Sequence, residues 1–164
     1  MRARHHAPAS LSVLDRLLDE HPDRSADPPH SEVRTQKQMR AALRRDLEAL
    51  LNATRPWIVL KPHQAMLETS PLGFGIADVT ARVLSNEEER ERIRADVEAT
   101  IHRFDPRLTD IRVTLLPDDA PLSAVIRLHI EGILLVDPQP EFVRYSTAIL
   151  PPGQPISVQA VRET

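Results

Sequence analysis

The chain contains no cysteine and has few aromatic residues and few glycines. Aromatic residues make up 3% of the 164 residues, and fifteen prolines outnumber four glycines. The absence of cysteine excludes disulfides, thiolate metal sites and a cysteine nucleophile, and it fits a reducing compartment. The excess of proline over glycine indicates stiff, defined connections between elements.

Long hydrophobic runs and an excess of positive charge are also missing. Apolar runs such as Ile133–Val136 are far too short to span a bilayer. A net charge of −3 with so few aromatic residues argues against a dedicated nucleic-acid binder. The seven histidines include no pair spaced four residues apart, and no nucleotide-binding glycine motif occurs. We therefore expect no metal, no cofactor, no small-molecule substrate and no membrane insertion.

A hydrophobic content of 41% is enough for a core of ordinary size. We expect one α+β domain over residues 31–164. Residues 1–30 are expected to form a flexible N-terminal segment that contains a short helix at about 11–20, followed by a proline-rich gap.

Three leucines of the predicted N-terminal helix leave two roles open. Leu14, Leu17 and Leu18 lie on one stripe of the short N-terminal helix. They could pack on their own domain or dock into a groove of another subunit. Trp57 is expected to anchor the core or its rim.

Hydrophobic periodicity predicts two long helices between about residues 32 and 105. Apolar residues recur at three- and four-residue spacing over about residues 32–53. Ser85 and Glu88 form a predicted capping box that begins a second helix. That helix should end at about Asp105, because Pro106 lacks an N–H and disfavours the helical conformation of the residue before it.

Beyond residue 107 the hydrophobic period changes from 3.6 to 2. Alternation predicts strands near residues 111–115, 124–131, 142–150 and 156–161, with a bulge at Gly132. N-terminal helices followed by an antiparallel β-meander of three to four strands packed on a long helix make an α+β fold.

The run Asp105-Pro106-Arg107 lies where the second helix gives way to strands. One reading is a helix stop with a local ion pair. The other is a docking point for a partner, because the planar guanidinium of arginine binds carboxylates through two parallel hydrogen bonds. On the second reading, Arg107→Ala should leave the fold intact and weaken assembly.

Five motifs, in this order, point to a family. They are Leu14–Leu17 (Leu-Asp-Arg-Leu), the helical Arg44–Asn52, Gly75–Asp78 (Gly-x-x-Asp), Phe104–Leu108 (Phe-Asp-Pro-Arg-Leu) and Val113–Leu116 (Val-Thr-Leu-Leu). The chain resembles the TssE baseplate subunits of type VI secretion systems, in the phage baseplate-wedge lysozyme-like family. The signature of that family at the turn from the second helix to the strands is Glu-Pro-Arg. Asp105 is therefore one methylene shorter than the expected acid.

The resemblance implies a cytoplasmic structural subunit with no enzymatic activity. Such a subunit sits in the baseplate wedge with TssF and TssG, and its further candidate partners are TssK and the sheath subunits. It would help to nucleate polymerisation of the contractile sheath. The candidate partner-binding residues are Asp105, Pro106, Arg107, Leu14, Leu17 and Leu18.

Two other functions are alternatives to this one. A cell-wall glycosidase would need two carboxyl groups about 5–10 Å apart in a cleft. The acids with apolar neighbours are Glu68, Asp78, Asp105 and Glu131, and nothing in their spacing forces two of them together. The other alternative is a small adaptor in another complex.

The C-terminal strands suggest two further surfaces. Arg127, His129 and Glu131 alternate with apolar residues and are expected to form the solvated face of a strand. An open edge at residues 156–161 would allow strand addition to a sheath or wedge chain. The alternative is an edge protected by Pro155 and by the shortness of the strand.

Overall fold

The computed structural model describes residues 32–58, 61–79, 86–117, 125–137, 139–150 and 154–161. In chain order the elements are helix α2 (Glu32–Asn52), the short 3-10 helices η1 (Pro62–Thr69) and η2 (Pro71–Gly73), helix α3 (Glu87–Phe104), and strands β1 (Leu108–Leu115), β2 (Ile126–Leu134), β3 (Glu141–Ile149) and β4 (Val158–Ala160). The strands form one antiparallel sheet in the order β1-β2-β3-β4. The predicted α+β fold is confirmed. The predicted N-terminal helix at 11–20 lies outside the described residues.

Both long helices lie close to where the sequence predicts them. Helix α2 ends at Asn52, one residue before the predicted end, and α3 ends at Phe104 with Asp105 as its C-cap. The predicted N-cap of α3 is wrong by one residue, because Asn86 takes that role. Its Oδ1 accepts a hydrogen bond from the backbone N of Glu88 at 2.9 Å. Ser85 lies outside the described residues.

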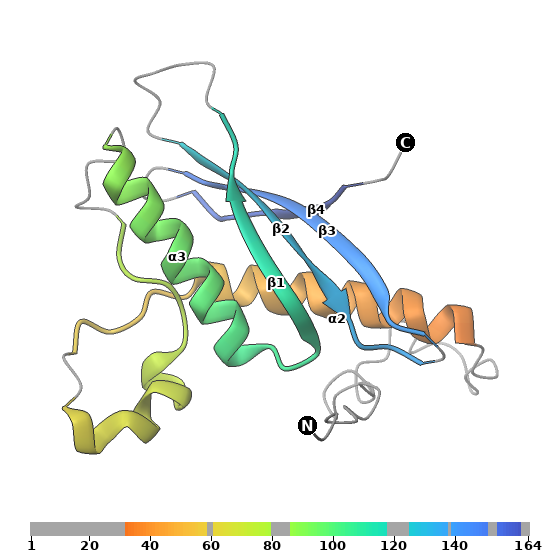
Figure 1. Cartoon of the computed structure of the whole chain (residues 1–164), viewed down its shortest axis with the longest axis horizontal. Helices are drawn as coiled ribbons and strands as arrows, with labels where there is room; N and C mark the ends of the chain where they lie inside the picture. Colours follow the sequence, from red (N-terminus) through yellow and green to blue (C-terminus); the bar gives the residue numbers. More distant parts are fainter. Residues whose placement is uncertain are drawn as a thin grey trace, which may run out of the picture.

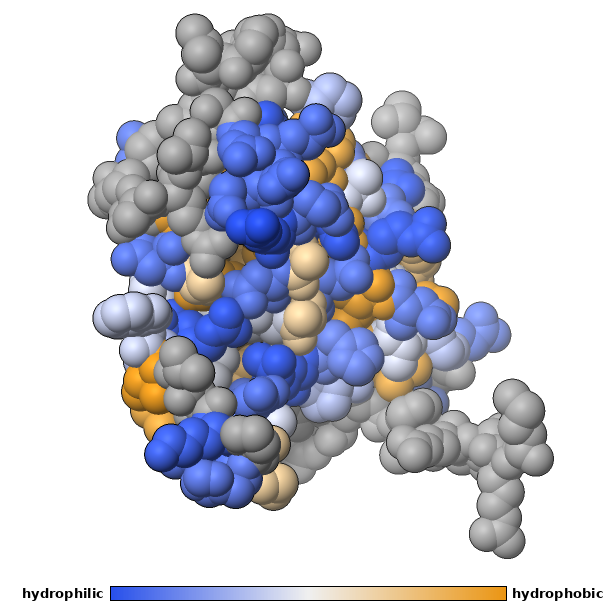
Figure 2. All heavy atoms as spheres, turned by 60° about the vertical axis from the view of Figure 1, so that its left-hand side comes forward, coloured by the Kyte–Doolittle hydropathy of each residue, from blue (hydrophilic) through white to orange (hydrophobic). Residues whose placement is uncertain are grey.

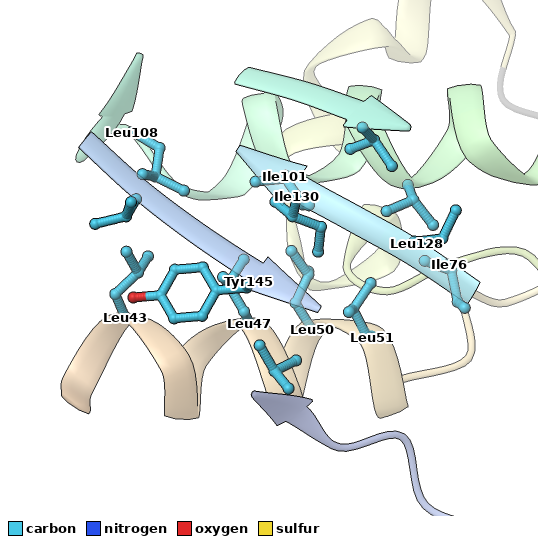
Figure 3. Close-up of a cluster of buried hydrophobic side chains, with 14 of the residues drawn as sticks. Leu43, Leu47, Leu50, Leu51, Ile76, Ile101, Leu108, Leu128, Ile130 and Tyr145 are labelled. Atoms are coloured by element: carbon cyan, nitrogen blue, oxygen red, sulfur yellow. The ribbon is translucent and has the colours of Figure 1, made fainter. Parts of the chain in front are cut away.

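The core lies between the helices and one face of the sheet (Figures 1 and 3). Alternate residues of β2 and β3 are buried, as the period of two predicts. They pack against the apolar stripe of α2 and against Ile93, Val97 and Ile101 of α3. Tyr145 is 3% exposed in this core, and burial raises its pKa to about 12 because the charged phenolate would lose its hydration.

The sheet irregularity lies in β1 and not in β2. The β1–β2 register shifts between Thr109 and Arg112, and Asp110 there has a φ of 50°. Gly132, where a bulge was predicted, lies opposite this shift. A Cβ atom at Gly132 would lie 3.2 Å from the carbonyl oxygen of Thr109. The glycine therefore gives the bulged strand room to approach, and the alternation in β2 continues to Leu134.

Candidate functional site

The corner between α3 and β1 is a tight, hydrogen-bonded turn. The backbone N–H of Asp105 donates to the carbonyl oxygen of Ile101 at 2.9 Å, which closes the last turn of α3. The carbonyl of Asp105 then accepts from the N–H of Leu108 at 3.3 Å, where β1 begins. Pro106 lies at the tip of this turn and is exposed. The helix therefore ends where its sequence predicts, and the proline faces solvent.

Asp105 and Arg107 form a buried two-pronged ion pair at this corner. Arg107 Nε donates to Asp105 Oδ1 at 2.9 Å, and Nη2 donates to Oδ2 at 2.7 Å. The backbone N–H of Arg107 adds a third bond to Oδ1 at 3.2 Å. The side chains of Asp105 and Arg107 are only 5% and 16% exposed. The local ion pair of the first reading is therefore present in the structure.

The same arginine also joins the corner to helix α2. Arg107 Nη2 donates to Asp46 Oδ2 at 2.8 Å, across 61 residues of sequence. The hydrogen bonds to Asp105 and the charge of both carboxylates raise the pKa of Arg107 above its ordinary value, although burial opposes this. Its guanidinium thus stays charged and holds α2, α3 and β1 together. That Arg107 also contacts a partner remains a prediction.

A second feature was missed by sequence reasoning. Residues 53–58 and 61–79, which we call the projecting segment, extend to the side of the sheet next to α3 (Figure 1). Among the described residues, six large hydrophobic side chains are exposed, and five of them lie in this segment. They are Trp57, Ile58, Met66, Leu72 and Phe74. Figure 2 views this side of the molecule and shows hydrophobic groups within a mostly hydrophilic surface.

The prediction that Trp57 anchors the core or its rim is wrong, because its side chain is 100% exposed. The chain leaves the core just before it. Arg55 N–H donates to the carbonyl of Ile76 at 2.8 Å, and Thr54 forms an isolated parallel bridge with Ile76. Beyond this bridge Pro56 directs the chain outward. A cluster of large apolar residues without a helical or strand period was the available sequence signal.

Both ends of the projecting segment are fastened to one carboxylate of α3. Asp96 Oδ1 accepts from Arg55 Nη2 at 2.7 Å, and Asp96 Oδ2 accepts from the backbone N–H of Ala77 at 2.9 Å. Phe74 packs edge-on against Phe104, with ring centroids 5.3 Å apart. The segment therefore has a fixed attachment to α3, including its last residue before the corner.

A cavity of about 300 Å³ opens beside this attachment. Its walls include the apolar Pro56, Ile58 and Leu72. Two ion pairs also line it, one between Arg55 and Asp96 at 2.7 Å and one between Arg103 and Glu68 at 3.5 Å. The lining of this cavity is therefore mostly polar, and its charged side chains are paired within the chain.

Helix side chains bind the backbone of one residue in each edge strand and of Ile156, which lies just before β4. On β1, Val113 N–H donates to Glu98 Oε2 at 2.9 Å, and its carbonyl accepts from Arg94 Nη1 at 3.1 Å. This pair from α3 occupies groups that an added strand would need.

On β4, side chains of α2 do the same. Val158 N–H donates to Glu48 Oε1 at 2.9 Å. The amide of Asn52 bonds both the N–H and the carbonyl of Ile156, each at 2.8 Å. Of the two readings for residues 156–161, this arrangement favours the protected edge, although the protecting groups come from α2 and not from Pro155.

The remaining predicted residues are placed as follows. Leu14, Leu17 and Leu18 lie outside the described residues. Within the described ranges, no group of three histidine or acidic residues could hold a metal ion. None of the helices described in the structure is both long and apolar enough to cross a bilayer.

One comparison with known proteins identifies a family. The family described as baseplate wedge protein gp25 matches residues 37–139, which is well over half of the chain. The match begins within α2 and includes the projecting segment, α3, the corner and the first two strands. No curated protein and no solved structure matches the chain. A family match of this extent shows that the chain belongs to the baseplate wedge protein gp25 family.

Proposed function

We propose that this chain is a structural subunit of a type VI secretion baseplate wedge that acts in the cytoplasm. Family membership gives the coarser statement, a structural baseplate role that involves assembly with other baseplate subunits. The observation that carries the proposal is the exposed apolar surface of the projecting segment. A monomer seldom leaves a fully exposed tryptophan beside further large apolar side chains unless a partner covers them.

The partners in this proposal are TssF and TssG, with TssK and the sheath subunits as further candidates. The projecting segment would supply the apolar centre of the contact. Trp57 and Met66 are 100% and 83% exposed, and both residue types are enriched in protein interfaces. Leu14, Leu17 and Leu18 would add a second apolar contact from the N-terminal region.

The Asp105-Pro106-Arg107 corner would be the rigid element of the same assembly. Pro106 is exposed at its tip, and the ion pair beneath it fixes the angle of the turn. A proline on a fixed turn loses little conformational entropy on binding, which favours affinity. In this proposal Arg107 acts mainly by holding the corner in place.

Nucleation of sheath polymerisation is the proposed consequence of this assembly. Strand exchange with a sheath chain at β4 would require Asn52 and Glu48 to release Ile156 and Val158. Partner binding near α2 could supply that release. No catalytic step belongs to the proposal. Asp105 is one of the four acids that a glycosidase could have used. Its carboxylate and that of Asp46 both accept hydrogen bonds from Arg107.

Co-expression with TssF and TssG from the same genome tests the proposal. The wild-type chain should co-elute with them on affinity capture and size exclusion. Trp57→Ala should lose most of this co-elution while its thermal unfolding stays unchanged, because the side chain is fully exposed. The matched control is His63→Ala, an exposed residue of the same segment. If a well-folded wild-type chain does not co-elute, the proposal fails.

A separate variant tests the corner. Pro106→Ala leaves the ion pair of Asp105 and Arg107 in place and removes the exposed ring. Weaker co-elution with less than about 1 kcal/mol of lost stability would support a contact at the tip. Unchanged co-elution would limit the corner to a structural role.

A further inference from the structure

The first half of helix α2 is strongly basic. From Val33 to Arg45 the sequence contains five basic residues and no acid, whereas the whole chain has a net charge of −3. The five are Arg34, Lys37, Arg40, Arg44 and Arg45. The charge of this stretch is therefore opposite in sign to that of the molecule that carries it.

Two of these cations have no acidic partner among the described residues. Arg40 and Arg45 each pair with a carboxylate at 3.0 Å. Lys37 and Arg44 are exposed and pair with none of the described acids. Glu48, one turn beyond Arg44, instead accepts a hydrogen bond from the backbone of β4. The charges of Lys37 and Arg44 are therefore available to acidic groups from outside the described domain.

Lys37 and Arg44 lie on one side of α2, two helical turns apart. Seven residues at 1.5 Å each place them about 10 Å apart along the helix axis. Ala41 lies between them on that side and is exposed, so no large side chain of the helix interrupts the line that joins them. An extended chain can therefore pass along this side of α2 and meet both cations.

The sequence before α2 has the complementary charge. Residues 19–30 contain four acids and one arginine, and their other titratable groups are two histidines. Three of these residues are prolines, which favour an extended conformation of about 3.1 Å per residue. Asp23 and Asp27 are then about 12 Å apart, which is close to the spacing of the two exposed cations.

The length and the direction of this segment also fit α2. Residues 21–30 span about 30 Å when extended, and the 21 residues of α2 span about the same distance. The segment is joined to the first turn of α2. When it runs back along the helix, Asp27 meets Lys37 first, and Asp23 then meets Arg44. Its far end arrives at the last turn of α2, beyond which the projecting segment begins.

We propose that residues 21–30, which we call the strap, lie along this side of α2. In this arrangement Asp27 pairs with Lys37. Asp23 pairs with Arg44, two turns further along the helix. Exposed ion pairs are individually weak, so the strap is held reversibly and is released by salt. Its prolines lower the conformational entropy lost on ordering, and its attachment to α2 gives it a high effective concentration.

The strap carries the predicted helix of residues 11–20 to the end of α2, beside the projecting segment. The leucines of that helix, Leu14, Leu17 and Leu18, then lie close to Trp57. The two apolar contacts proposed for wedge assembly thus become parts of one surface. This consequence rests on the proposed wedge function, whereas the strap itself does not.

A single spin label on the full chain tests the strap. Because the chain has no native cysteine, a nitroxide on Arg16→Cys is the only label. It should broaden the amide signals of residues 50–55 more than those of residues 36–40, since the strap places position 16 near the end of α2. Without a strap the order is reversed, because position 16 is then tethered only to the first turn of α2.

Charge reversal tests the two ion pairs of the strap. Lys37→Glu with Arg44→Glu should lower the broadening at residues 50–55 about threefold or more. Further addition of Asp23→Lys with Asp27→Lys should restore it, because each pair then has opposite charges again. Salt at about 0.5 M should lower the broadening in the wild-type background as the charge reversal does.

A matched control makes the same charge change elsewhere on the surface. Arg92→Glu with Arg112→Glu alters exposed residues of α3 and β1 and should lower the broadening less than about 1.5-fold. Unchanged amide signals of the buried Val97 show that each variant is folded. Three results would overturn the proposal. They are stronger broadening at residues 36–40 than at 50–55, equal losses in the two double variants, or broadening of unlabelled chains mixed with labelled ones, which would make a second copy the source.

Discussion

Arg107→Ala offers the sharpest test of what holds the corner. The substitution removes the bonds from Nε and Nη2 to Asp105 and the bond from Nη2 to Asp46. It leaves a carboxylate that is 5% exposed with one backbone N–H donor, at 3.2 Å. Breaking a buried ion pair costs about 3–5 kcal/mol, and the vacated space admits some water, so we expect a loss of about 3 kcal/mol. The expectation from sequence is that this variant leaves the fold intact and weakens assembly, and the geometry adds a measurable loss of stability.

Urea unfolding followed by circular dichroism measures this loss. With a slope of about 2 kcal/mol per molar urea, the midpoint should fall by about 1.5 M. Arg92→Ala is the control, since its side chain is 66% exposed in surface ion pairs, and should cost less than about 1 kcal/mol. The double variant with Asp105→Ala should cost clearly less than the sum of the single variants. A loss no larger than that of Arg92→Ala, or strict additivity, would refute this account of the corner.

Three further predictions concern the core, the projecting segment and the β4 edge. Because the pKa of Tyr145 is raised from 10.0 to about 12, the unfolded state loses its proton first, so stability should fall by about 2 kcal/mol between about pH 10 and pH 12. Tyr145→Phe should remove this fall in urea titrations. Gly75→Ala should lower the free energy of unfolding by about 2 kcal/mol or more, as measured by thermal unfolding. Gly75 has a φ of 99°, and a Cβ there would lie 2.3 Å from the carbonyl oxygen of Ala53. A loss below about 0.5 kcal/mol would contradict this. Asn52→Ala should lower the free energy of unfolding by about 1 kcal/mol, because it removes both hydrogen bonds to Ile156. It should also speed amide hydrogen exchange at Ile156 but not in β2.

The sequence predicted those parts of the fold that depend on local signals. The periodic stripe of α2 and the proline at position 106 located a helix and a helix end to within one residue. Alternation located the strands, because one face of the sheet is buried and the other is not. The N-cap of α3 was misplaced because Ser85 and Asn86 are adjacent residues of almost equal capping preference.

The parts that the sequence did not predict depend on distant contacts. The bond between Arg107 and Asp46 joins residues 61 positions apart, and no local pattern marks Asp46 as its acceptor. The bulge was assigned to Gly132 because glycine is the local marker, whereas the shift lies in the opposite strand. Trp57 was expected at the core or its rim, and its exposure depends on the bridge between Thr54 and Ile76, which no local pattern marks.

The attachment of the projecting segment has a consequence for how this protein can diversify. Its two ends meet at a single side chain, Asp96, which binds Arg55 and the backbone of Ala77. A loop whose ends are pinned together can gain or lose residues at little entropic cost, since loop closure depends only weakly on length. Insertions or deletions between positions 56 and 72, which keep Phe74, Gly75 and Ile76 in place, would therefore leave the sheet and both long helices undisturbed. Relatives that differ in length only there could bind different neighbours on an unchanged frame, and grafting one such loop onto another relative should transfer the choice of neighbour.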